Sequence, residues 1–321
     1  MEETAQERPL VTFALFAYNQ EEYIREAIEG AFSQTYEPLE IILSDDCSTD
    51  RTYEIMQEMA ANYVGPHKLR VRRNDINQGL ANHINVLLEN ASGEYISWIG
   101  GDDVALQNKV EELIRPILYD EEVVGVHSPF IEINEVGEFI KVKVSRKEKE
   151  NISLNKVISE CASVISQSHL FKCSVFHQFG PFLSDLKNEG PAISFRELYY
   201  GKIAYVSIPL TKYRIGSGIS TYRGTDIRVL QSIEPIKVAE WRLSAYRQIL
   251  SDLRHTNLYD IYGCKVSKKI IFYQNLININ SKKKIVRSLI ENTALNPKDF
   301  STLRAVIRIL SPQAFYKLLK T

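Results

Sequence analysis

Cysteine is scarce in this sequence, with four residues in a chain of 321. Cys47, Cys161, Cys173 and Cys264 are far apart and form no Cys-x-x-Cys pair, which excludes a disulfide framework and a zinc-finger pattern. The six histidines show no metal-ligand spacing either. Free thiols are typical of a reducing compartment, so we expect a cytoplasmic protein.

Long apolar runs and an excess of charge are also missing. The longest apolar run, Ile270 to Asn280, is too short and too polar to span a bilayer. The first residues, "MEETAQERPL", are acidic and polar, so we expect no secretory signal. The net charge is −1, so the chain is no polycation and we expect no nucleic-acid partner.

Three familiar site signatures are absent too. The sequence contains no G-x-G-x-x-G dinucleotide loop, no G-x-x-x-x-G-K-[ST] phosphate loop and no H-E-x-x-H zinc motif. What remains is an ordinary globular composition, 44% hydrophobic and 25% charged. Charge is unevenly distributed, since residues 265–321 hold twelve Lys and Arg against two acids, a net +10 that leaves −11 for residues 1–264.

Short apolar runs alternate with amphipathic segments through the first half. The predicted strands are residues 10–16, 39–44, 68–73, 94–99 and 123–128, and the predicted helices are residues 21–33, 50–61, 80–88 and 107–118. This alternation predicts an α/β fold with a mostly parallel sheet flanked by helices. Further along, we expect a hairpin over 130–144, a helix over 191–200, strands over 202–207 and 210–214, and helices from 226 onward.

Polar residues follow four consecutive predicted strands. They are Tyr18-Asn19, Asp45-Asp46, the segment 74–79 and Asp102-Asp103. Because ligands of such sheets bind outside the carboxyl ends of the strands, these groups are candidates for one site.

Two interpretations of Asp45 and Asp46 stay open at this point. A carboxylate at a strand end can accept the imide N–H of a uracil or thymine ring. Asp and Ser in "LEIILSDDCSTDRT" are also common turn and helix-capping residues, which alone is a sufficient explanation.

Asp102 and Asp103 in "YISWIGGDDVALQNKV" also have two interpretations. They can hold Mg²⁺ or Mn²⁺ against the phosphates of a nucleotide, with neighbouring glycines allowing close backbone approach. They can instead form a polar loop before the next helix. Glu189 in "SDLKNEGPAISFREL" is a candidate base for an acceptor hydroxyl or a solvated loop acid, with Asp185 a weaker competitor.

Four segments, read together, resemble a family-2 glycosyltransferase (GT2) with the GT-A fold. They are "FAYNQEEYIREAIEGAFSQTYEPLEIILSDDCSTDRT", "NDINQGLANHIN", "GEYISWIGGDD" and "FRELYYGKIAYVSIPLTKYRIGSGIS", spanning residues 10 to about 221. Their joint order is specific, although each is modest alone. We therefore predict a GT-A glycosyltransferase domain over residues 1–222 and a helical, basic extension over 223–321.

The resemblance implies a role for each matching residue. Tyr18 and Asn19 flank the nucleotide base, Asp45 and Asp46 read the pyrimidine, and Asn77, Gly79 and Asn82 line the ribose or phosphates. Asp102 and Asp103 hold the metal and diphosphate. Glu189 falls at the family's Glu-Asp pair and is the carboxylate closest to the position of the catalytic base. Arg196 follows on the next helix in the nucleotide-sugar site, and Tyr213-Arg214 match a late Tyr-Arg pair. The sequence departs from the family pattern at Gly100, Gly190 and Gly216, which stand where the family has the first aspartate of its D-x-D motif, the usual base aspartate and a late histidine.

These matches imply a sugar transferase acting from a UDP- or dTDP-sugar donor. The expected acceptor is a hydroxyl of a saccharide or lipid-linked acceptor in surface polysaccharide biosynthesis, with inversion and with Mg²⁺ or Mn²⁺ as cofactor. The basic C-terminal region, including residues 282–284 and a helix around residues 303–310, either contacts anionic lipid at the inner face of the membrane or packs on its own domain. Two rivals remain: a catalytically silent nucleotide-sugar-binding subunit and a sugar nucleotidyltransferase.

Overall fold

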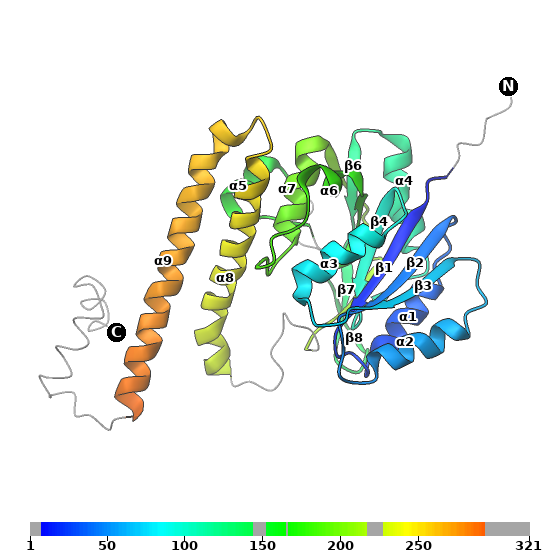
Figure 1. Ribbon diagram of the computed structural model, residues 1–321, viewed down its shortest axis with the longest axis horizontal. Coiled ribbons are helices and arrows are strands. Elements are labelled where there is room, and N and C mark those ends of the chain that lie inside the picture. The colour runs from blue at the N-terminus through cyan, green and yellow to red at the C-terminus, as the bar shows by residue number, and fades with distance from the viewer. Residues whose placement is uncertain (1–7, 144–151, 165, 217–226, 293–321) are drawn as a thin grey trace, which may run out of the picture.

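The computed structural model describes residues 8–143, 152–164, 166–216 and 227–292 (Figure 1). Its centre is a seven-stranded sheet in the order β10-β6-β9-β4-β1-β2-β3. The strands are β1 (Val11–Ala17), β2 (Leu39–Asp45), β3 (Lys68–Arg73), β4 (Tyr95–Gly100), β6 (Val123–His127), β9 (His169–Lys172) and β10 (Lys202–Tyr205). All neighbouring strands are parallel except β9, which runs antiparallel between β4 and β6. The mostly parallel α/β sheet predicted from the sequence is confirmed.

Helices cover both faces of this sheet. The helices of the first half are α1 (Ile24–Phe32), α2 (Thr52–Ala61), α3 (Gly79–Asn90) and α4 (Lys109–Tyr119). Phe13 and Leu15 of β1 pack in one core with α1, α2 and α4, whereas Ala14 belongs to a second core with α3. The alternation of side chains along β1 therefore divides the two layers.

A smaller sheet with the order β5-β11-β7-β8 lies beside the main one. Its strands are β5 (Val104–Ala105), β7 (Phe130–Ile133), β8 (Phe139–Lys143) and β11 (Thr211–Arg214). The predicted hairpin is present as the antiparallel pair β7–β8, and β11 pairs with both β7 and β5. Because β5 begins directly after Asp103, this small sheet fixes the end of the Asp102-Asp103 turn.

Two long helices follow in the last described part of the chain. The short elements α5 (Leu154–Glu160), η1 (Ser166–Ser168) and α6 (Ser174–Phe179) precede α7 (Gly190–Tyr200), and α8 (Ile227–Leu253) and α9 (Tyr259–Asn292) follow. Figure 1 shows α8 and α9 as an antiparallel pair beside the α/β body. A third core made of Val157, Phe195, Tyr246, Ile249 and Val266 packs this pair against α5 and α7.

Parts of the predicted extension lie outside the described residues. The boundary at 222/223 falls within the segment 217–226, and the predicted helix around 303–310 follows the last described residue. Among the helices of the described ranges, none is long and apolar enough to cross a bilayer.

Candidate active site

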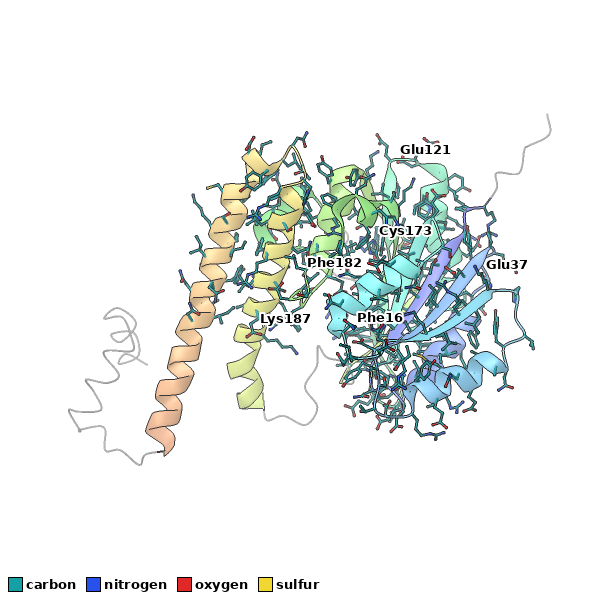
Figure 2. The ribbon with its side chains drawn as sticks, in the orientation of Figure 1. Phe16, Glu37, Glu121, Cys173, Phe182 and Lys187 are labelled. Carbon is teal, nitrogen blue, oxygen red and sulfur yellow. The ribbon has the colours of Figure 1, made fainter. Side chains whose placement is uncertain are left out.

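A cleft of about 570 Å³ opens at the carboxyl ends of the parallel strands. Figure 2 labels Phe16, which lines the cleft from the end of β1, and Lys187, which lines it from the side of α8. Ten of the residues singled out in the sequence line it: Tyr18, Asp46, Asn77, Gly79, Gly100, Asp102, Asp103, Glu189, Gly190 and Tyr213. Residues from four strand ends and from the start of α7 therefore meet in one cavity.

Asp46 lies on the floor of the cleft, with only 3% of its surface exposed. Its Oδ1 accepts hydrogen bonds from Asn74 Nδ2 (2.7 Å) and from the backbone N–H of Gln78 (2.8 Å), and its Oδ2 accepts one from the N–H of Gly79 (2.9 Å). Gly79 has a φ of +72°, a conformation that favours glycine, which aims its N–H at the carboxylate. Three of about four acceptor positions of this carboxylate are therefore filled by the chain itself.

Tyr18 and Asn77 lie at the rim above Asp46. Tyr18 is 39% exposed, and Asn77 is exposed with its Oδ1 accepting the N–H of Gly79 at 2.9 Å. An aromatic ring and an amide at the mouth of a cleft offer stacking and hydrogen bonding to a planar ligand.

His83 also lines the cleft, although nothing in the sequence singled it out. Its Nε2 lies 2.6 Å from Ser44 Oγ, and its Nδ1 lies 4.0 Å from Asp46 Oδ2. Burial lowers the pKa of His83 to about 4, and the nearby Asp46 charge only partly opposes the shift. The ring is therefore neutral at physiological pH.

Three other predicted residues support the cleft from outside its lining. Asp45 is fully buried, accepts the N–H of Ser48 at 2.9 Å and pairs with Arg73 Nε at 3.1 Å, which is turn chemistry. Asn19 Oδ1 accepts the N–H of Thr49 at 2.8 Å, and Asn82 Nδ2 donates to the carbonyl of its own helix at residue 78. These side chains hold the loops that carry Tyr18, Asp46 and Gly79.

Asp102 and Asp103 face different surroundings. Asp103 is 2% exposed, and its Oδ1 accepts the backbone N–H of Arg214 at 2.9 Å, while Arg214 Nε donates to the carbonyl of Asp102 at 2.9 Å. Arg214 also contacts the Glu26 carboxylate, and its guanidinium lies 4.7 Å from the Tyr23 ring centroid. Arg214 therefore fixes the turn, and Asp102 is the half-buried member at the cleft.

Burial is the largest influence on the pKa values of Asp103 and Lys109. Desolvation, with the Asp102 charge beside it, raises the pKa of Asp103 well above its usual range. Lys109 is fully buried nearby and donates from Nζ to the carbonyls of Trp98 (3.0 Å) and Gln167 (2.6 Å). Burial lowers the pKa of Lys109 to about 7, although the Asp103 charge opposes the change.

The two carboxylates suit a hard divalent cation. A Cβ placed on Gly100 would lie 3.0 Å from Asp102 Oδ1 and 3.8 Å from Asp103 Oδ2, so Gly100 leaves space beside both oxygens. Within the described ranges, no three His, Cys, Asp or Glu side chains form a metal-binding cluster. Mg²⁺ is commonly held by one or two carboxylates plus substrate phosphates, so the residues fit such an ion once phosphate oxygens complete the shell.

Packing gives a reason for glycine at position 101 that the sequence did not suggest. A Cβ there would lie 2.7 Å from Ala17 Cβ and 3.1 Å from Ile24 Cδ1. Glycine at this position allows the turn to pack against the end of β1 and against α1. Close backbone approach to phosphate stays a prediction for this position.

Glu189 lies at the N-terminus of α7 and is 9% exposed. Its Oε1 accepts a hydrogen bond from Ser166 Oγ at 2.6 Å, which leaves its other oxygen for a ligand. A Cβ on Gly190 would come within 3.1 Å of Ser163 Cβ and 3.3 Å of the Val164 carbonyl, so the family's aspartate would be crowded there. Asp185 is outside the lining and pairs with Arg247 at 3.0 Å.

Arg196 occupies the interface between α7 and α8. The fully buried guanidinium forms a bidentate pair with Asp252, with Nε–Oδ2 at 2.8 Å and Nη2–Oδ1 at 3.0 Å, and donates from Nη1 to the Gly180 carbonyl at 2.9 Å. It is not among the residues that line the cleft. These contacts give Arg196 a structural role.

A stripe of side chains on α8 holds the loop that leads to Glu189, and no local sequence pattern indicated it. Gln248 Oε1 accepts the N–H of Leu183 at 2.7 Å, Ser244 Oγ accepts the N–H of Lys187 at 3.0 Å, and Glu240 pairs with Lys187 Nζ at 2.7 Å. The spacing of four residues along α8 places these side chains on one face of the helix. Only the folded chain brings residues so distant in sequence together.

Comparison with known proteins identifies the family. The model described as "Glycosyl transferase family 2" matches residues 12–177. An uncharacterized glycosyltransferase of Haemophilus influenzae is 33% identical over 125 residues, which is 39% of this chain and 38% of that protein. The putative glycosyltransferase EpsE of Bacillus subtilis is 36% identical over 106 residues, 33% of this chain and 37% of that one. The chain thus spans little more than a third of these curated relatives.

Solved structures share the fold at low sequence identity. S. aureus TarS 1-349 has a TM-score of 0.57 at 14% identity, covering 95% of this chain and 82% of that chain. The mannosyltransferase PcManGT from Pyrobaculum calidifontis, in complex with GDP-Man and Mn²⁺, has a TM-score of 0.54 at 14% identity. The match covers 97% of this chain and 84% of that chain. These neighbours are GT-A glycosyltransferases with a C-terminal helical region, so the predicted fold class is confirmed. The chain belongs to glycosyl transferase family 2.

Proposed function

We propose that this glycosyltransferase moves a sugar from a UDP- or dTDP-sugar to a hydroxyl of a saccharide or lipid-linked acceptor, with inversion. The observation that carries the proposal is the meeting of Asp46, Asp102 and Glu189 around one cleft. They are a base-reading carboxylate, a diphosphate-side carboxylate and a general base. A structural neighbour solved with UDP-GlcNAc supports a nucleotide-sugar donor.

The donor nucleotide binds on the side of Tyr18 and Asp46. The Asp46 carboxylate keeps about one acceptor position after its three internal hydrogen bonds, which suits a single imide N–H of a pyrimidine. Tyr18 at the rim stacks on the base. Asn77 and Gly79 line the part of the cleft that receives the ribose and the phosphates. A buried acceptor position that would be left unpaired discriminates against a ring that lacks the N–H.

Asp102 and Asp103 hold Mg²⁺ or Mn²⁺ together with the donor diphosphate. The ion supplies positive charge that stabilises the departing diphosphate. The mannosyltransferase neighbour was solved with GDP-Man and Mn²⁺, which supports a divalent metal in this fold. Arg214 keeps the two acids in place through its backbone N–H and its guanidinium.

Glu189 accepts the proton of the acceptor hydroxyl. The freed oxygen forms a bond to the anomeric carbon while the bond from that carbon to the diphosphate breaks, with its electron pair going to the diphosphate. A single displacement of this kind inverts the anomeric configuration. The hydrogen bond from Ser166 holds one Glu189 oxygen, so the other is oriented toward the acceptor.

The test compares Glu189→Gln with Asp185→Asn, an acid of the same loop whose carboxylate is tied to Arg247. Transfer from a panel of UDP- and dTDP-sugars is measured together with UDP titration in the presence of Mn²⁺. We expect Glu189→Gln to lower kcat by about 10²–10⁴ with UDP affinity unchanged, and Asp185→Asn to behave as wild type. Full activity in Glu189→Gln with loss in Asp185→Asn would assign the base to Asp185.

Two rivals give different outcomes in the same experiment. Metal-dependent UDP binding with no turnover of any donor would favour a silent nucleotide-sugar-binding subunit. Formation of a nucleotide-sugar from a sugar phosphate and a nucleoside triphosphate would favour a nucleotidyltransferase, although that class needs a Gly-rich, basic phosphate loop that "FALFAYNQ" does not provide.

We further propose a role in surface polysaccharide synthesis, in the cytoplasm at the inner face of the membrane. The described part of α9 exposes apolar and basic side chains together, with Ile271 60% and Phe272 57% exposed and Lys265 and Lys268 also exposed. Such a surface suits anionic lipid. Sedimentation with anionic and neutral vesicles tests it, and equal pelleting with both would contradict the electrostatic contribution.

A further inference from the structure

Trp241 is a feature of the cleft that the proposed chemistry leaves unused. It comes from α8, in the predicted C-terminal extension, yet it lines the same cavity as Asp46 and Glu189. The ring is half-buried, whereas the other tryptophan of the chain, Trp98, is 1% exposed in the core. A large aromatic side chain at a ligand cavity presents an apolar face to whatever binds there.

The wall around Trp241 is held firmly. Ser244 Oγ donates to the Trp241 carbonyl at 2.9 Å and accepts the N–H of Lys187 at 3.0 Å. Lys187 also pairs with Glu240, the residue before Trp241, at 2.7 Å. Trp241 is therefore fixed against the loop that runs through Asn188 to Glu189.

One side of the Trp241 ring is already covered. Lys237, one turn earlier on α8, places its Nζ 4.9 Å from the ring centroid. Lys237 is not among the residues that line the cleft, whereas Trp241 is. The ring is thus backed by a cation on one side and offers its other side to the cavity.

The charge of this wall argues against phosphate as its ligand. The Lys187 ammonium is matched by the Glu240 carboxylate at 2.7 Å, and Asn188 is neutral. The Asp102-Asp103 pair, which lines the same cleft, is the part that suits a metal and diphosphate. A neutral ligand that is apolar on one face and rich in hydroxyls at its edge fits an aromatic ring flanked by an amide and an ammonium.

We propose that Trp241, with Asn188 and Lys187 beside it, forms a subsite on which a pyranose ring of the acceptor stacks. This inference rests on the proposed function, because the acceptor hydroxyl must come within hydrogen-bond reach of Glu189. Asn188 and Lys187 immediately precede Glu189 and line the same cavity, so a sugar on Trp241 lies beside the base. The helical extension thus supplies the acceptor platform.

Acrylamide quenching of tryptophan fluorescence tests the subsite. Trp98 is buried, so quenching of the full chain reports Trp241. The probes are methyl β-D-glucopyranoside, methyl β-D-galactopyranoside and methyl α-D-mannopyranoside, with glycerol as a hydroxyl-rich control that has no ring face. We expect at least one pyranoside to lower the quenching constant severalfold and saturably, and glycerol to leave it unchanged.

UDP with Mn²⁺, titrated in parallel by calorimetry, separates this inference from the proposed function. UDP binding with no protection of Trp241 by any of the three pyranosides would overturn the subsite alone. Protection by UDP itself would move Trp241 to the donor wall and also overturn it. Absence of UDP binding would overturn the proposed function. The Trp98→Phe variant carries Trp241 as its sole tryptophan and is expected to reproduce the pyranoside response.

Discussion

Replacing Arg196 by leucine separates a structural role from a nucleotide-binding one. The substitution leaves the Asp252 carboxylate buried without its bidentate partner and leaves the Gly180 carbonyl without its donor. Asp252 then keeps only the hydrogen bond from Gln248 Nε2 at 2.8 Å. Because Arg196 is fully buried and Asp252 is 1% exposed, water cannot replace the lost charge without opening the interface between α7 and α8.

The expected loss in the free energy of unfolding follows from the cost of breaking a buried ion pair. Removing one partner of such a pair costs about 3–5 kcal/mol, a large share of the roughly 5–15 kcal/mol of a typical domain. The guanidinium also lies 4.6 Å from the Phe182 ring centroid, and leucine has no charge with which to form this cation–π contact. We therefore expect Arg196→Leu to lower the free energy of unfolding by at least about 3 kcal/mol.

Urea denaturation followed by circular dichroism measures the loss, and titration with UDP in the presence of Mn²⁺ measures binding in the folded protein. The double variant Arg196→Leu, Asp252→Leu removes both charges and is expected to recover part of the stability. Unchanged stability in Arg196→Leu, together with loss of UDP binding, would refute the structural role and restore the nucleotide-binding role that the family resemblance implies.

Three further predictions concern the site and its surroundings. Burial lowers the pKa of two histidines, to about 4 for His83 and about 3 for His127. Because these rings stay neutral in the folded chain while the unfolded chain takes up protons below about pH 6.5, stability is lost as the pH falls from 6.5 toward 4. The loss is about 2 kcal/mol per histidine at pH 5, and urea midpoints that are equal at pH 7.5 and 5 would contradict it. Gly100→Asp places a Cβ 3.0 Å from Asp102 Oδ1 and adds a carboxylate beside the pair, so we expect tighter Mn²⁺-dependent UDP binding. Weaker binding in calorimetry would show that the space is not a metal site. Ser166→Ala removes the 2.6 Å hydrogen bond to Glu189. We expect it to lower kcat/KM about two- to tenfold, which corresponds to roughly 0.5–1.5 kcal/mol, and to leave the UDP affinity unchanged. An equal loss of UDP affinity would count against the positioning role of Ser166.

The sequence anticipated the elements whose signals are local. Buried strands such as β1 and β2 are continuous apolar runs, and the apolar face of α1 repeats with helical period, so these elements were predicted close to their bounds. The strand β9 was missed because its four residues carry no periodic signal, and its antiparallel place between β4 and β6 depends on tertiary pairing. The short helices α5 and α6 were missed for the same reason.

The site was anticipated only in part, again for a physical reason. Parallel strands end at one edge of the sheet, so Tyr18, Asp46 and Asp102 could be expected to meet. The distinction between Asp45 and Asp46 could not be foreseen, because Asp45 ends β2 and Asp46 begins the turn after it. Only the folded turn shows which of the two carboxylates reaches the cleft. Trp241 reaches the cleft through the packing of α8 on α7, which no local pattern encodes.

Isothermal titration with UDP shows whether Asp102 holds a divalent ion and a nucleotide diphosphate in this cleft. Wild type, Asp102→Ala and the control Asp185→Asn are titrated with UDP, each with and without Mn²⁺. We expect Mn²⁺-dependent binding in wild type and control, and a loss of at least about tenfold in Asp102→Ala, as expected for a charge-assisted contact of roughly 1.5–3 kcal/mol. Equal UDP affinity in all three proteins, with Mn²⁺ making no difference, would contradict this expectation.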